Sequence, residues 1–157
     1  MRRFKQELPD IESQRILTIG KYAVWAVSGD DDYPYAVPVN YVYDGTVTYI
    51  HCARQGHKID SILRNPKCSM CIVNKDDVVP DEFTSYFRSV ILFGKAEIVE
   101  DEAERLKALQ LLCDKYSPGI HPNDEIAKSL KAVCIVRINI DSISGKEAIE
   151  LTRQRKS

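Results

Sequence analysis

"VPVNYVYDGTVTYIHCARQGHKID", residues 37–60, contains two apolar stretches joined by a tight turn and followed by a helix start. β-Branched and aromatic residues flank Asp44-Gly45, a dipeptide typical of a two-residue hairpin. We therefore expect strands over 35–43 and 46–53. After Gly56, apolar residues at helical spacing predict a short helix over 56–66, which Asn65-Pro66 ends.

The flanking sequence continues this β pattern. Residues 22–28 are rich in β-branched and aromatic residues and predict a strand, and 29–34 has the composition of a turn. With the two strands of the hairpin, this strand is expected to form an antiparallel meander. Further strands are predicted over 68–74, 86–101 and 132–145, with 75–85 as a loop. Gly94, inside the long strand, indicates a bulge or a close backbone approach.

Three more helices are expected. Residues 10–20 form the first, with Asp10 as a possible cap and Gly20 as its end. Residues 101–117 give the clearest helical pattern, with acidic residues in the first turn and one apolar face, made by Leu106, Leu109, Leu112 and Cys113. A loop over 118–124 and a helical turn or two over 125–131 precede the last strand.

Hairpin-linked strands without regular strand–helix alternation favour an antiparallel barrel over a parallel sheet. We therefore predict a mainly β (α+β) fold, a six-stranded antiparallel split β-barrel with peripheral helices. At 157 residues, without repeats or a convincing linker, the chain is expected to form a single domain over 1–157.

Composition narrows the function classes. The 44% hydrophobic and 29% charged residues are typical of a soluble globular protein. The 22 basic and 23 acidic residues nearly cancel, so the chain has no general attraction for nucleic acid or anionic membrane, and neither partner is expected. The basic ends are interpreted as solvated tails.

Location follows from what the sequence lacks. No apolar run approaches the ~20 residues that span a bilayer, and the basic N-terminus leads into a polar segment rather than the apolar core of a signal peptide. A cytoplasmic protein is expected. The odd number of cysteines, five, then indicates free thiols.

The histidines and cysteines do not form a convincing metal site. His51 and His57 belong to different predicted elements, and Cys52 faces away from His51 on its strand. Cys68 and Cys71 form one C-x2-C pair, but residues three apart in a strand point to opposite faces, and there is no second pair. We expect no metal, and we interpret Cys68, Cys71, Cys113 and Cys134 as small buried hydrophobic residues.

An anion site fits the turn before the helix better. The first amides of a helix lack intrahelical partners, and their partial positive charge favours a phosphate. Gly56 permits an unusual backbone conformation there, Lys58 adds a full charge in the first turn, and Arg54 can add a bidentate contact. The alternative is a simple turn with a solvated lysine.

The same residues resemble a known family. The stretch 37–60, "NPKCSMCIV" (65–73) and "YFRSVILFGKAEIVED" (86–101) resemble the pyridoxamine 5'-phosphate oxidase-like flavoproteins, especially their nitroimidazole-resistance (Nim) type. The likeness runs from Tyr22 to Glu100. It implies a split β-barrel that forms a homodimer and holds flavin mononucleotide (FMN) at the subunit interface.

The resemblance also implies site residues. The segment along the flavin ring corresponds here to Pro38, Val39, Asn40 and Tyr41. The segment holding the ribityl-phosphate corresponds to His51, Cys52, Ala53, Gly56, His57 and Lys58. A third segment contributes Arg88, Ser89 and Val90, where Phe87 replaces an expected tyrosine. Of these, His51 is the predicted catalytic residue, which would donate a proton or orient substrate near the ring.

The implied function is a flavin-dependent oxidoreductase. Electrons would pass from a nicotinamide nucleotide through FMN to a small acceptor such as a 5-nitroimidazole; FAD is a possible replacement for FMN. The sequence has no G-x-G-x-x-G motif, so the nicotinamide nucleotide would bind only transiently. The alternative is a flavin or haem carrier of the same fold without turnover.

Overall fold

The computed structural model describes residues 4–120 and 132–157. The strands are β1 (Ala23–Ser28), β2 (Pro34–Val39), β3 (Val42–Tyr43), β4 (Val47–Ala53), β5 (Lys67–Val79), β6 (Thr84–Ile98) and β7 (Val133–Glu147). The α-helices are α1 (Asp10–Ile19), α2 (His57–Arg64), α3 (Glu102–Tyr116) and α5 (Ile149–Lys156), and 3-10 turns cover Phe4–Gln6, Asp30–Asp32 and Pro80–Glu82. The helix expected over 125–131 and most of the loop over 118–124 lie outside the described residues.

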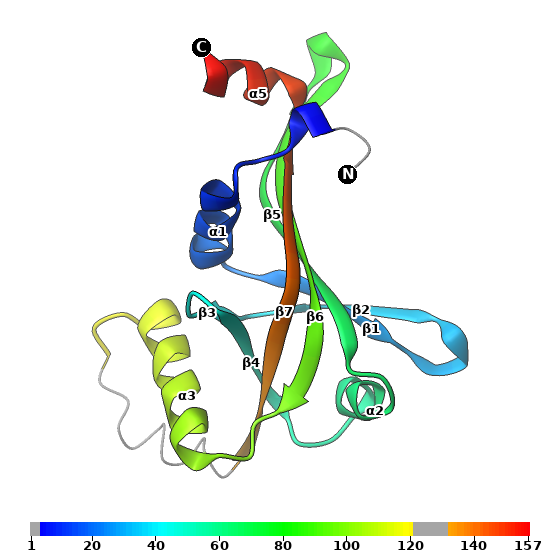
Figure 1. The fold of residues 1–157 in the computed structure, drawn as a ribbon, viewed down its shortest axis with the longest axis vertical. Helices are drawn as coiled ribbons and strands as arrows, with labels where there is room; N and C mark the ends of the chain where they lie inside the picture. The colour runs from blue at the N-terminus through cyan, green and yellow to red at the C-terminus, as the bar shows by residue number, and fades with distance from the viewer. Residues whose placement is uncertain (1–3, 121–131) are drawn as a thin grey trace.

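The strands form one antiparallel sheet in the order β2-β1-β5-β6-β7-β4-β3. β5, β6 and β7 run along the long axis of the molecule (Figure 1). The predicted split barrel with peripheral helices is confirmed, with seven strands in the described part instead of six. The extra strand arises because the segment 35–43 breaks at Asn40-Tyr41. Its first half pairs with β1 at one edge of the sheet, and its second half pairs with β4 at the other.

The break corrects the expected meander of three strands. β1–β2 and β3–β4 are each hairpins, but the segment Asn40–Tyr41 carries the chain from one edge of the sheet to the other. We call this segment the crossover. The Asp44-Gly45 turn is confirmed: Gly45 has φ +102°, and the Asp44 carboxylate accepts hydrogen bonds from the backbone N–H groups of Thr46 and Val47.

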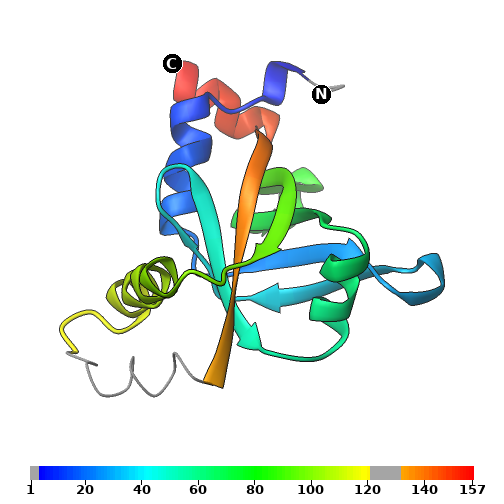
Figure 2. The same ribbon diagram turned by 60° about the horizontal axis from the view of Figure 1, so that its bottom comes forward.

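The sheet is strongly curved (Figure 2), and the main cluster of buried residues lies on its inner face. Its largest fully buried members include Trp25, Met70 and Leu92, which occupy one row across β1, β5 and β6. The helix α2 contributes Ile59 and Ile62 to the same cluster. The predicted helix after Gly56 is thereby confirmed, with its apolar side closing the core.

The outer face of the sheet has two different environments. Over β4 and β7, α3 packs Leu109 and Leu112 against Tyr49 and Ile135 in a second apolar cluster, whereas Leu106 is 46% exposed. Over β5 and β6, in contrast, large apolar side chains are exposed. Ile91 and Phe93 are 39% and 56% exposed, respectively.

Gly94 is confirmed as a point of close backbone approach. The pairing of β6 with β7 shifts register between Phe93 and Gly94, and a Cβ on Gly94 would overlap the carbonyl oxygen of Asn139. The prediction of a loop over 75–85 is largely wrong, because β5 and β6 continue as a paired hairpin as far as Val79 and Thr84.

The C-terminal basic segment is a helix rather than a solvated tail. Leu151 and Thr152 of α5 are buried, and Arg155 donates to the fully buried carboxylate of Glu147 at 2.8 Å. The 3-10 turn Phe4–Gln6 and α5 lie close together at one end of the molecule (Figure 1). Within residues 4–120 and 132–157, no helix combines the length and apolar character that crossing a lipid bilayer requires.

Candidate functional site

The turn between β4 and α2 has the geometry of an anion site. Gly56 has φ +122°, and a Cβ at this position would meet no atom within 4 Å, so this side of the turn is open. No side chain caps α2, and its first internal bonds run from the amides of Ile59 and Asp60 to the Gly56 carbonyl. The amides of His57 and Lys58 precede these bonds and can face a ligand. A phosphate therefore fits this turn.

The two histidines near this turn have separate surroundings. His57 Nδ1 lies 3.2 Å from the Asp30 carboxylate, and its ring meets Tyr35 edge-on with centroids 4.5 Å apart. The His57 side chain thus holds the turn between β1 and β2, while its backbone begins α2. His51, on β4, is exposed, and its side chain makes no hydrogen bond or ion pair with any described residue.

Successive residues of β4 face opposite sides of the sheet, as expected for a strand. His51 and Ala53 face outward and are exposed, whereas Cys52 packs against the core directly opposite Cys134 of β7. Burial raises the pKa of the Cys52 thiol to about 11, although the charge of Lys58 opposes the shift. Cys52 is therefore a neutral thiol near pH 7, which excludes it as a ready nucleophile.

The remaining cysteines divide between two environments. All five are free thiols, as expected. Cys68 and Cys134 are buried, whereas Cys71 and Cys113 are only half-buried, so their interpretation as buried hydrophobic residues holds for two of the four.

The crossover is fixed by the last turn of α3. The Tyr116 hydroxyl accepts from the Tyr41 N–H at 3.0 Å and lies 2.7 Å from the Lys21 carbonyl oxygen and 2.8 Å from that of Tyr41. Lys115 Nζ donates to the Tyr41 carbonyl at 2.9 Å and lies 4.1 Å from the centre of the Tyr41 ring. Asn40 adds a bond from its amide to the Lys21 carbonyl. The backbone that the resemblance places along a flavin ring is thus held rigidly.

Pro38, Val39 and Tyr41 have different orientations around this segment. Pro38 is exposed on the outer face, and Val39 packs against the core. Tyr41 is fully buried, and its hydroxyl donates to the Leu17 carbonyl at 2.7 Å. Only Pro38 and Asn40 of this group are exposed.

A pocket of about 340 Å³ lies between the crossover, β4 and α3. On one side it is lined by residues of α3 and its C-terminal end: Leu109, Leu112, Cys113, Tyr116 and Ser117. On the other side it is lined by Asn40, His51 and Val133. Two of the predicted site residues thus share one cavity, which we call the α3 pocket.

The α3 side of this cavity was not predicted from the sequence. The apolar face of α3 was evident, but an apolar helix face carries no local signal for a ligand site. Neither Lys115 nor Tyr116 carries a local signal for a site, since their role depends on contacts about 75 residues away in the sequence.

Arg88, Ser89 and Val90 lie elsewhere in the chain. On β7, Arg88 pairs with Glu147 and His51 pairs with Ile135, twelve positions apart, which corresponds to roughly 40 Å of strand. The Arg88 guanidinium is engaged by Glu147 at 2.9 Å and lies 3.6 Å from Glu12. Val90 is fully buried. Within one chain, these residues do not join the groups around His51 and Lys58.

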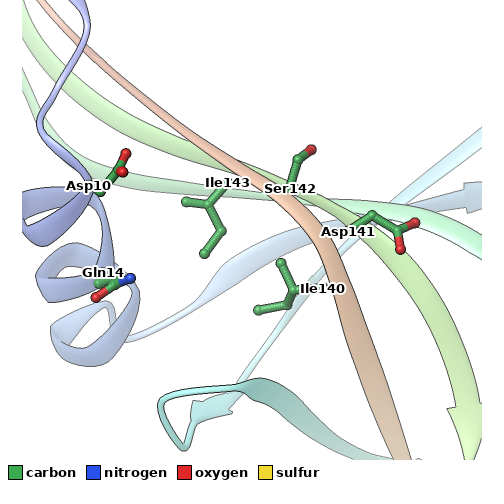
Figure 3. Close-up of a pocket in the computed structure, with 6 residues that line it drawn as sticks. All are labelled: Asp10, Gln14, Ile140, Asp141, Ser142 and Ile143. Carbon is green, nitrogen blue, oxygen red and sulfur yellow. The ribbon is translucent and has the colours of Figure 1, made fainter.

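A second cavity, of about 280 Å³, lies between α1 and β7 (Figure 3). Asp10 and Gln14 come from α1, and Asp141 comes from the opposite side. Figure 3 shows the side chain of Asp141 pointing away from α1. The polar groups do not converge, and no predicted site residue lines this cavity, so the α3 pocket and the adjacent turn remain the candidate site.

Lys115, which contacts the crossover, is expected to make the free energy of unfolding depend on pH. Burial lowers its pKa to about 8, from an ordinary value of 10.5. Between these values the unfolded chain binds a proton that the folded chain has released, so this group makes the folded state more stable as pH rises. We expect the free energy of unfolding of the native protein to rise relative to that of Lys115→Met between about pH 8 and pH 9.5, measured by urea denaturation. A constant difference across this range would contradict the assigned burial.

Comparison with known proteins places the chain in a family. A family model described as pyridoxamine 5'-phosphate oxidase matches residues 9–147. An uncharacterised protein of Rhizobium meliloti (strain 1021), RA0666, is 29% identical over 147 residues, which cover 87% of this chain and 91% of that protein.

Solved structures share the fold. An FAD-binding protein from Mesorhizobium loti is 25% identical, with a TM-score of 0.68 over 91% of this chain and 97% of that one. A protein described as a candidate 5-nitroimidazole antibiotic resistance protein, from Bacteroides thetaiotaomicron VPI-5482, is 21% identical, with a TM-score of 0.74 over 90% and 86% of the two chains. The second likeness concerns the fold alone.

Proposed function

Because this chain belongs to the pyridoxamine 5'-phosphate oxidase family, we propose that it is a flavin-dependent oxidoreductase whose cofactor occupies the site around the crossover, β4 and the turn before α2. The observation that carries the proposal is the open, uncapped start of α2 at Gly56, with Lys58 in its first turn. The FAD-binding relative from Mesorhizobium loti supports a flavin as the ligand.

The phosphate of the flavin binds at this turn. The amides of His57 and Lys58 donate to its oxygens, and the Lys58 ammonium balances its charge. Gly56 leaves the space for this approach, because any side chain there would project into the open side of the turn. FMN has a single phosphate that matches the single turn, and we propose FMN, with FAD as the alternative.

The flavin ring lies along the crossover near Pro38 and Asn40. A bound flavin would supply two-electron transfer from a nicotinamide nucleotide to a small acceptor, a nitroaromatic compound in our proposal. The protein holds the ring and excludes water from one side of it. His51 faces the same region without a partner among the described residues, so it can orient the acceptor and supply a proton.

A homodimer completes the site. The outer face of β5 and β6 exposes Ile91 and Phe93, and such apolar sheet faces commonly mark an interface. Ser89 shares this outer face, because it lies two and four positions before them on β6. Since Ser89 and His51 are far apart within one chain, both can contact one flavin only if Ser89 of the partner subunit reaches across the interface.

The alternative is a protein that binds flavin or haem without turnover. Anaerobic addition of NADH or NADPH to the purified, flavin-loaded protein distinguishes the two. We expect the flavin absorbance near its visible maximum to bleach rapidly and to return on addition of a nitroaromatic acceptor. Flavin that stays oxidised with both nucleotides would support the carrier instead. Mass analysis of the cofactor released by heat identifies FMN, FAD or haem directly.

The dimer has its own test. Light scattering at micromolar concentration is expected to give twice the mass of the chain, and Phe93→Glu is expected to shift the protein towards the monomer with loss of flavin. Lys156→Glu, an exposed position at the end of α5 and away from this face of β6, serves as the charge control. A native monomer that retains its flavin would contradict the proposal.

A further inference from the structure

The α3 pocket extends beyond the residues assigned to the flavin. Among the described lining residues, only Asn40 and His51 are also assigned to the flavin. The rest of the lining comes from α3, its C-terminal end and the start of β7. We propose that this part of the pocket binds the second substrate, a small, uncharged, planar molecule, between His51 and α3. This inference rests on the proposed function.

The walls of the α3 pocket favour an apolar ligand. Leu109, Leu112 and Val133 present aliphatic groups, and Cys113 presents a thiol. None of the described lining residues is a lysine, arginine, aspartate or glutamate. A charged ligand would therefore lose its hydration without gaining a charged partner, which is costly. The volume of about 340 Å³ lies near the lower end of the range of ~300–1,000 Å³ for ligand pockets, which suits a one-ring molecule.

The polar groups are concentrated at the crossover side. The imidazole of His51 has no hydrogen-bond or ion-pair partner among the described residues. The Asn40 amide donates to the Lys21 carbonyl and keeps a second N–H for a ligand. The Tyr116 hydroxyl, in contrast, is engaged by the backbone of Tyr41 and Lys21, so this residue presents its ring rather than a free donor. A bound molecule would direct a hydrogen-bond acceptor towards His51 and Asn40 and its apolar body towards α3.

This arrangement makes Cys113 a specificity-determining residue. It is half-buried, lines the pocket and lies outside the flavin residues. Cys113→Phe fills the cavity, while Leu106→Phe places the same ring on an exposed part of α3 that does not line it. Comparing these two variants separates the effect of lost pocket volume from a general effect of phenylalanine on α3.

The probes are nitrobenzene, which is planar and uncharged, and 4-nitrobenzoate, which adds a carboxylate to the same ring. Binding is followed by the perturbation of the flavin absorbance in the oxidised holoprotein. We expect nitrobenzene to bind roughly tenfold or more tightly than 4-nitrobenzoate, because none of the described lining residues offers the carboxylate a cation. Cys113→Phe should weaken nitrobenzene binding roughly tenfold and leave flavin affinity within about twofold, and Leu106→Phe should change neither.

A second measurement does not depend on a substitution or on bound flavin. Nitrobenzene is expected to slow alkylation of Cys113 by N-ethylmaleimide, followed by peptide mapping, and to leave the rate at Cys71 unchanged, since Cys71 lies on β5 and is not among the described lining residues. Absence of protection, or equal protection by 4-nitrobenzoate, would overturn the inference. Loss of flavin binding in Cys113→Phe would also overturn it, because the pocket would then hold the flavin ring itself. Failure of the native protein to bind flavin, in contrast, would count against the proposed function.

Discussion

Glu147→Ala is expected to lower the melting temperature by roughly 6–20 °C. The carboxylate of Glu147 is fully buried and holds two guanidinium groups, those of Arg88 and Arg155, at 2.9 and 2.8 Å. Removing it leaves both positive charges without their main partner. Breaking a buried ion pair in this way costs about 3–5 kcal/mol, and each kcal/mol corresponds to about 2–4 °C for a domain of this size.

Scanning calorimetry or circular dichroism on the variant measures this effect. Glu150→Ala is the matched control, because Glu150 lies in the first turn of α5 and is only half-buried. It should shift the melting temperature by no more than about 2 °C. If Glu147→Ala had the same melting temperature as the control variant, Arg88 and Arg155 would have equivalent partners without this carboxylate.

Lys58→Ala is expected to weaken FMN binding roughly tenfold to hundredfold. The lysine lies in the uncapped first turn of α2, and a hydrogen bond to a charged group contributes about 1.5–3 kcal/mol. Riboflavin lacks the phosphate, so its affinity should be nearly unchanged. Fluorescence titration of the apoprotein with both flavins gives the two affinities.

Two further variants sharpen this experiment. Gly56→Val should weaken FMN at least as much as Lys58→Ala, because a β-branched residue is strained at φ +122° and its side chain enters the open side of the turn. Lys156→Ala removes an exposed lysine from the end of α5 and should leave both affinities unchanged. If Lys58→Ala weakened riboflavin as much as FMN, Lys58 would not contact the phosphate.

The parts of the fold that local chemistry determines were predictable from the sequence. The Asp44-Gly45 hairpin and the start of α2 after Gly56 depend on turn residues and apolar spacing, and both are present. The extension of β5 and β6 through 75–85 was not predictable, because most of its residues are exposed and its composition, with Pro80 and four acidic residues, disfavours a strand. Pairing between the two strands decides the structure of this segment, rather than burial of one apolar face.

The break at the crossover was also not predictable from local sequence. Valine and tyrosine, which favour strands, dominate residues 35–43, and Asn40 is the one local sign of the point where the chain changes edge. The candidate site was predicted only on its β4 and crossover side. The α3 wall depends on tertiary packing, and the separation of Arg88 from His51 depends on strand order, neither of which a local pattern contains.

The hydrogen bonds of the Tyr116 hydroxyl to the crossover make the conformation of the candidate site depend on the packing of α3 against the sheet. The Tyr41 amide proton is held by a side chain 75 positions later in the chain, rather than by a neighbouring strand. Its exchange with solvent deuterium therefore requires α3 to detach locally, not the sheet to unfold. The Tyr41 amide would act as a built-in reporter of that partial opening, exchanging sooner than amides in the centre of β6. A ligand that bridges the crossover and α3 would slow this exchange by adding its own binding energy to the docked state.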